Sequence, residues 1–180
     1  PSKVEKSLKR LLDLDYDKSK IFLHLNMGHE TELAVTHPMM ENLMSFGKFF
    51  YTENHKKTNI LQENAFREFL DQDVDYLFMI DSDCKVENPN ILQDLIKNNK
   101  NFVSPLLKHK ESSFSNYWNG NKKDFLEKVK TKDEYEAIFD GVLRGCFNVS
   151  FVDKCFLIKK EILPKIQHFY RKNNNGYPDN

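Results

Sequence analysis

The sequence is poor in cysteine, and this excludes several kinds of small domain. Its 180 residues include three cysteines, Cys84, Cys146 and Cys155. Three are too few for a disulfide framework, and no two of them form a Cys-x-x-Cys pair, so the spacing excludes a zinc ribbon and a thioredoxin-like motif. All three lie in or beside apolar segments, where a thiol usually packs as a small hydrophobic group. We therefore expect no nucleophilic triad built on cysteine.

An excess of charge of one sign is also missing. The 27 basic residues balance 27 acidic ones, which removes the overall attraction that phosphate backbones and anionic membranes would exploit. We therefore expect no dedicated binding of nucleic acid. No apolar run approaches the roughly 20 residues of a membrane span, and the first residues lack the apolar region of a secretory signal. We expect neither a membrane span nor a targeting segment within these residues.

Aromatic residues, by contrast, are abundant. The chain is 39% hydrophobic and 13% aromatic, with 15 Phe and 7 Tyr, whereas disordered chains have few aromatic residues and unbalanced charge. The length suits one domain, and no repeat or low-complexity linker divides it, so we predict a single domain over residues 1–180. The tail Asn-Asn-Asn-Gly-Tyr-Pro-Asp-Asn is turn-like with no closing element. We therefore expect the domain to be truncated and the natural polypeptide to continue past Asn180.

Helical and strand patterns alternate along the first hundred residues. Apolar residues at i, i+4, i+7 and i+8 from Val4 predict a helix. Apolar runs predict strands at 21–25, 48–51 and 76–80, and helices are predicted at 39–46, at 58–70 and from Asn88 with Pro89 in its first turn. Later strands are predicted at 102–107, 114–118 and 149–159, before a helix at 161–172. The alternation indicates an α/β fold on a mostly parallel open sheet, with 76–80 as a buried central strand.

Two carboxylates, Asp81 and Asp83, follow directly after the predicted strand 76–80. Open α/β sheets bind their ligands at the carboxyl ends of strands. Neighbouring carboxylates repel each other unless a divalent cation neutralises them, and such a cation often completes its shell with substrate phosphates. The pattern thus favours a metal site that takes a nucleotide diphosphate, and the alternative is a solvated turn. A calcium loop is excluded because Lys85 and Val86 stand where an oxygen ligand and a glycine are needed.

Other polar and aromatic residues are candidates for substrate contacts. Tyr117 and Trp118 would form an apolar platform for one face of a substrate, which is a sugar if the family resemblance described below holds, with Asn116 as a hydrogen-bond partner. The alternative is that both aromatic residues pack under a loop. Asn148 has three interpretations: a polar contact in an acceptor cleft, a strand-end hydrogen bond, or a glycosylation acceptor in the sequon Asn148-Val149-Ser150.

Iron oxygenase chemistry is not expected in this chain. The nearest approach to a 2-His-1-carboxylate set is His109, Glu111 and His168, but the first two lie in a polar turn and the third in an amphipathic terminal helix rather than on a barrel strand. His24 lies in the middle of an apolar strand, where we expect a packed core histidine rather than a metal ligand.

Four stretches carry a resemblance to a known family. They are LLDLDYDKSKIFLHLN, DYLFMIDSDCKVENPNILQDLIKNNKNFVSPLL, FSNYWNG and RGCFNVSFVDKCFLIKKEIL. From Leu11 to Leu163 the chain resembles the glycosyltransferase-like accessory domain of the procollagen-lysine 2-oxoglutarate 5-dioxygenases, the collagen lysyl hydroxylases. It is also similar to the procollagen galactosyltransferases. The resemblance implies a GT-A fold, which is a Rossmann-like nucleotide-diphospho-sugar transferase fold.

The resemblance also implies a chemistry for the candidate residues. In active members Asp81 and Asp83 would hold Mn²⁺ against the diphosphate of a UDP-sugar, and the sugar would pass to hydroxylysine or galactosyl-hydroxylysine of collagen-like chains. Asp179 is then the candidate base for the acceptor hydroxyl. Fe(II) and 2-oxoglutarate would belong to another domain of the parent protein, and the compartment would be the endoplasmic reticulum lumen or an equivalent.

The family resemblance also allows an alternative in which the domain has no catalytic activity. In it, this domain is a non-catalytic accessory domain that supports a neighbouring Fe(II)/2-oxoglutarate lysyl hydroxylase domain. Two departures bear on this choice: Gln62 stands where relatives often carry a basic residue, and the acidic motif late in the fold is cut short at Pro178 and Asp179.

Overall fold

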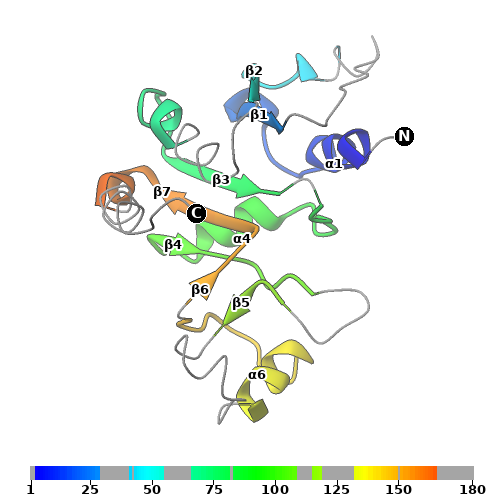
Figure 1. Ribbon diagram of the computed structural model, residues 1–180, viewed down its shortest axis with the longest axis vertical. Coiled ribbons are helices and arrows are strands. Elements are labelled where there is room, and N and C mark those ends of the chain that lie inside the picture. Colours follow the sequence, from blue (N-terminus) through cyan, green and yellow to red (C-terminus); the bar gives the residue numbers. More distant parts are fainter. Residues whose placement is uncertain are drawn as a thin grey trace, which may run out of the picture.

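The computed structural model describes residues 3–28, 41, 43–54, 66–81, 83–108, 115–118, 132–149 and 151–165. Its labelled helices are α1 (Lys3–Leu12), α4 (Ile91–Lys97) and α6 (Lys132–Phe139), with 3-10 turns η1 (Lys18–Lys20) and η2 (Lys160–Ile162). Its strands are β1 (Phe22–Gly28), β2 (Lys48–Asn54), β3 (Tyr76–Ile80), β4 (Phe102–Val103), β5 (Tyr117–Trp118), β6 (Phe151–Val152) and β7 (Cys155–Lys159). In Figure 1, α1, β1 and β2 lie at one end, β5, β6 and α6 at the other, and β3, β7 and β4 between them.

The strands form three small sheets that confirm an α/β protein but not a mostly parallel one. β1 and β2 are parallel, with Phe22 opposite Lys48. β7 lies between β3 and β4 and runs antiparallel to both, and β5 pairs antiparallel with β6. Within the described residues, β1–β2 is thus the only parallel pair. An apolar run such as 76–80 indicates burial, and burial does not specify the direction of the neighbouring strand.

Most elements predicted in the first hundred residues are present. The predicted strand 76–80 coincides with β3, and α1, β1 and β2 lie at the predicted places. The prediction that 76–80 is a buried central strand is wrong for the described residues, because β7 is the central strand of this sheet and the five residues of β3 are only partly buried. Of the predicted helix 39–46, residues 41 and 43 are helical, and of the predicted helix 58–70, residues 66–70 are helical. The predicted terminal helix begins as η2 and is helical to residue 165, and the rest of it lies outside the described residues.

Helix α4 begins later than predicted. Its first residue is Ile91 and its N-cap is Asn90, not Asn88. The Asn88 side-chain oxygen accepts a hydrogen bond from the Asn90 backbone N–H at 2.9 Å, and the Asn88 carbonyl accepts one from the Ile91 N–H at 3.2 Å. Asn88 and Pro89 therefore form a turn that precedes the helix, because the asparagine side chain competes for backbone N–H groups.

The predicted strand 149–159 is interrupted by a turn. Asp153 and Lys154 separate β6 from β7, and Lys154 has φ of 67°. This left-handed backbone is uncommon for a residue other than glycine, and it redirects the chain so that β6 pairs with β5 while β7 pairs with β3 and β4. The predicted strands 102–107 and 114–118 are likewise shorter, as β4 and β5 contain two residues each.

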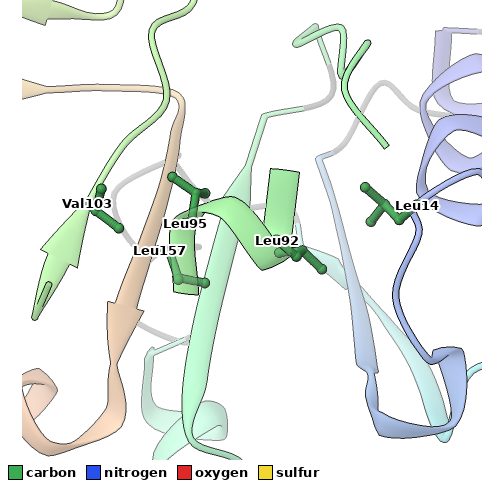
Figure 2. Packing of buried hydrophobic residues seen from close by; sticks show 5 residues of the cluster. All are labelled: Leu14, Leu92, Leu95, Val103 and Leu157. Carbon is green, nitrogen blue, oxygen red and sulfur yellow. The ribbon is translucent and has the colours of Figure 1, made fainter. Parts of the chain in front are cut away.

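Helix α4 packs on the three-stranded sheet and closes the main core. Figure 2 shows Leu92 and Leu95 of α4 together with Val103 of β4 and Leu157 of β7. These side chains and Leu14 form one cluster of buried residues. Burying an aliphatic side chain of this size contributes about 1.5–3 kcal/mol. The cluster therefore holds β7 in place beside β3, whose end carries the two candidate carboxylates.

Candidate functional site

The two carboxylates lie where β3 ends, beside the turn that links β6 to β7. The Asp81 backbone N–H donates to the Lys154 carbonyl at 2.8 Å, and the Cys84 N–H donates to the Asp81 carbonyl at 3.0 Å. These bonds hold Cys84 close to the end of β3 and attach Asp81 to the β6–β7 turn. Asp81 and Asp83 are both exposed. The structure therefore places the pair at the end of a strand, as the sequence predicted, and leaves both side chains exposed to solvent.

A lysine distant in sequence neutralises half of this acidic pair. The Lys154 Nζ atom donates a hydrogen bond to Asp83 Oδ2, and the two side chains are 43% and 56% exposed. Hydrogen bonding to Asp83 raises the pKa of Lys154. Lys154 was not among the residues predicted from the sequence, although the polar pair Asp153-Lys154 inside an otherwise apolar run is a signal for a turn.

The Asp81 carboxylate is in a different position. In the described part of the chain no hydrogen bond or ion pair reaches its oxygens. Packing around the group raises its pKa, and the like charge of Asp83 raises it further against a smaller opposing effect of Lys154. An anion that is destabilised in this way gains from a nearby cation. Asp81 therefore has both the free oxygens and the electrostatic surroundings of a cation ligand.

These groups fit a divalent ion that is only partly coordinated by protein. Among the described residues no group of three or more His, Cys, Asp or Glu side chains is arranged to hold a metal. Hard cations such as Mg²⁺ are commonly held by one or two carboxylates, with waters and substrate phosphates completing the shell. The Lys154 ammonium already bonded to Asp83 stands in for such a cation and shows that positive charge is accommodated there.

The neighbouring thiols do not take part in the chemistry of this site. Cys84 and Cys155 are buried, whereas Cys146 is exposed. Burial, followed by the charges of Asp83 and Asp81, raises the pKa of Cys84 to about 11. Burial raises the pKa of Cys155 to about 12. Both thiols are thus protonated at neutral pH, which agrees with the expectation that these cysteines pack as hydrophobic groups.

Asn116 is buried and bonded to the turn between β6 and β7. It is 7% exposed, and its side-chain NH₂ donates to Ser104 Oγ at 2.8 Å, to the Pro105 carbonyl at 3.0 Å and to the Asp153 carbonyl at 3.2 Å. Its side-chain oxygen accepts from the Leu107 N–H at 2.7 Å. The side chain therefore ties the segment after β4 to the β6–β7 turn, and these bonds use the groups that were predicted to contact a sugar.

The other predicted substrate-binding residues, Tyr117, Trp118 and Asn148, differ in their surroundings. Tyr117 is buried, and its ring centroid lies 5.2 Å from that of Tyr135 in α6, which is the packing alternative. The backbone of Trp118 pairs with Phe151, and its side chain is not among the described groups. Asn148 is exposed in the segment before β6. Asp179 lies outside the described residues, as do His109, Glu111 and His168.

His24, predicted as a packed core histidine, is partly buried in β1 and contacts a carboxylate. Its Nδ1 atom lies 2.9 Å from Glu68 Oε2, and the histidine side chain is 15% exposed. Burial lowers the pKa of His24 against the opposing effect of the Glu68 charge.

No helix in the described part of the chain is long and apolar enough to cross a membrane.

Comparison with known proteins places this site within a family. The family model described as glycosyltransferase family 25, N-terminal domain, matches residues 44–178. A procollagen lysyl hydroxylase and glycosyltransferase of Acanthamoeba polyphaga mimivirus is 32% identical over 109 residues, which are 61% of this chain and 12% of the relative. A multifunctional procollagen lysine hydroxylase and glycosyltransferase of Caenorhabditis elegans is 25% identical over 98% of this chain and 25% of its own length.

The human multifunctional procollagen lysine hydroxylase and glycosyltransferase LH3 is 26% identical over 87% of this chain and 21% of its own length. The chain thus spans a quarter or less of the length of these relatives. The matched range 44–178 includes β3, the acidic pair and β7. The chain therefore belongs to the glycosyltransferase family 25 N-terminal domain family, and it is a glycosyltransferase-like domain related to the multifunctional lysyl hydroxylase and glycosyltransferases.

Proposed function

We propose that this domain, with a GT-A fold, binds a UDP-sugar through a divalent cation and transfers the sugar to hydroxylysine or galactosyl-hydroxylysine of collagen-like chains. The observation that carries the proposal is the Asp81 and Asp83 pair, exposed at the end of β3 inside the range matched by the family model. The relatives' names, which join procollagen lysine hydroxylation to glycosyl transfer, support this acceptor.

The chain's own residues would divide the work at this site. Asp81 and Asp83 would hold Mn²⁺, which when bound stabilises the negative charge that develops on a departing diphosphate. The backbone bond from Asp81 to Lys154 keeps the carboxylates beside the β6–β7 turn. Asn116 acts as a positioning residue for that turn through its bond to the Asp153 carbonyl. Asp179 stays the proposed base that accepts the acceptor's proton.

The surroundings of the domain form part of the proposal. Because the chain matches a quarter or less of each relative's length, we expect further domains of the parent protein as its partners. An Fe(II) and 2-oxoglutarate site would lie in one of those domains. The collagen-processing relatives support a secretory compartment such as the endoplasmic reticulum lumen.

A second candidate is a non-catalytic accessory domain that supports a neighbouring lysyl hydroxylase domain. The observation that favours it is the Lys154 ammonium on Asp83. If that lysine stays in place, the protein itself neutralises one of the two carboxylates, which reduces the need for a metal.

A thermal-shift titration with UDP and MnCl₂ distinguishes the two candidates. A ligand at 100 times its Kd stabilises the folded state by about 2.7 kcal/mol, which raises the Tm of a domain of this size by about 5–10 °C. We expect this shift in the wild-type chain, and we expect its loss in Asp83→Asn. Asp15→Asn is the matched control, because it removes one exposed carboxylate elsewhere. Absence of any shift in the wild-type chain would favour the accessory domain.

A further inference from the structure

The backbone of Lys154 is held firmly next to the acidic pair. Its carbonyl accepts the Asp81 N–H at 2.8 Å, and its own N–H donates to Asp153 Oδ1 at 2.8 Å. Its φ of 67° marks a turn conformation that the surrounding bonds impose. The point from which the lysine side chain extends is therefore fixed relative to Asp81 and Asp83.

The end of the side chain, in contrast, is held by a single exposed contact among the described residues. Lys154 Nζ bonds to Asp83 Oδ2, and both side chains keep about half of their surface in water. An exposed ion pair of this kind contributes little to stability. A lysine also has a flexible four-carbon stem and can move its ammonium while the backbone stays in place. The Lys154–Asp83 ion pair can therefore form and break with little change in the free energy of the protein.

We propose that Lys154 is an internal counter-ion that competes with a divalent cation for Asp83. In the metal-free protein its ammonium takes the place beside Asp83, and it turns away when a metal ion binds to the acidic pair. This inference rests on the proposed function, because it concerns the loading of the same site. It makes Lys154 a residue that sets the metal affinity rather than a ligand.

Mn²⁺ binding to the full 180-residue chain without nucleotide, measured by electron paramagnetic resonance of free Mn²⁺ at low salt, tests the inference. Removing a positive charge a few ångströms from a divalent ion should strengthen binding, and we expect about a tenfold gain in affinity for Lys154→Met. Lys154→Asn is a second variant that also lacks the charge and that suits a left-handed backbone. Lys154→Arg keeps the charge and should change the affinity by less than about twofold.

Lys159→Met provides the matched control. Lys159 lies at the opposite end of β7, five residues from Lys154, so its charge is about 15 Å away along the strand. That distance exceeds the screening length of about 8 Å at physiological ionic strength. At that ionic strength we therefore expect Lys159→Met to change the Mn²⁺ affinity by less than about twofold.

The outcomes separate this inference from the proposed function. If Asp83→Asn abolishes Mn²⁺ binding while Lys154→Met and Lys154→Asn leave it unchanged, the inference is overturned and the metal site stands. If Lys154→Met binds Mn²⁺ and the wild-type chain does not, the inference is upheld and the wild-type domain has the accessory role. If neither binds, the inference and the proposed metal site are overturned together.

Discussion

Replacing Asn116 by alanine tests whether this side chain is a structural tie or a sugar contact. Asn116 is buried and joins the segment after β4 to the turn between β6 and β7. Asn116→Ala removes the side-chain amide and leaves its partners inside the protein. If the residue is a structural tie, the substitution should lower the free energy of unfolding. If it is a sugar contact, the substitution should lower ligand affinity alone.

The structure gives the size of the expected effect. The groups that lose a partner are the Leu107 N–H, the Ser104 hydroxyl and the carbonyls of Pro105 and Asp153. A typical intramolecular hydrogen bond contributes about 0.5–1.5 kcal/mol net, and water entering the space left by Asn116 would replace some of the four. We therefore expect a loss of about 3 kcal/mol, which lowers the Tm by about 6–12 °C.

Urea denaturation of the wild-type chain and the variant measures this loss directly. Asn148→Ala is the matched control, because Asn148 is exposed and its removal should change the unfolding free energy by less than about 0.5 kcal/mol. A loss below about 1 kcal/mol for Asn116→Ala, with an unchanged denaturant slope, would refute the structural assignment. A selective loss of sugar-nucleotide affinity at unchanged stability would restore the sugar-contact prediction.

Two further predictions concern the backbone and the thiols. Gly47→Ala would place a Cβ 1.9 Å from the Ser19 carbonyl oxygen, so one of the two backbone segments has to move. We expect the free energy of unfolding, measured by urea denaturation, to fall by about 1–3 kcal/mol. Unchanged stability would contradict the close approach of the two segments. Alkylation of the native protein near pH 8 should modify Cys146 and spare Cys84 and Cys155, as mass spectrometry would reveal. Because burial raises the pKa of these two thiols from 9.0 to about 11 and about 12, the unfolded chain releases their protons first, so stability should fall as the pH rises from about 9 towards 12. A flat pH profile across this window would show that the thiols are not buried as described.

The bounds of β3 and the position of the acidic pair follow from local sequence. The run Tyr76–Ile80 coincides with β3, and Asp81 and Asp83 lie at its end as predicted. The start of α4 was predicted too early, because Asn88 has the composition of a cap but uses its side chain in a preceding turn. The interruption of 149–159 was also missed, because the turn signal of Asp153 and Lys154 is only two residues long and lies between apolar residues on both sides.

The sequence by itself determined that this chain folds, where most of its strands lie, and that two carboxylates follow the strand 76–80. These properties depend on the periodicity and chemistry of side chains within one segment. Only the tertiary structure decided that β7 runs antiparallel beside β3, that Lys154 meets Asp83 across 71 positions of sequence, and that Asn116 is used in holding the turn. An apolar pattern records that a residue is covered, but the path of the chain decides which distant segment covers it.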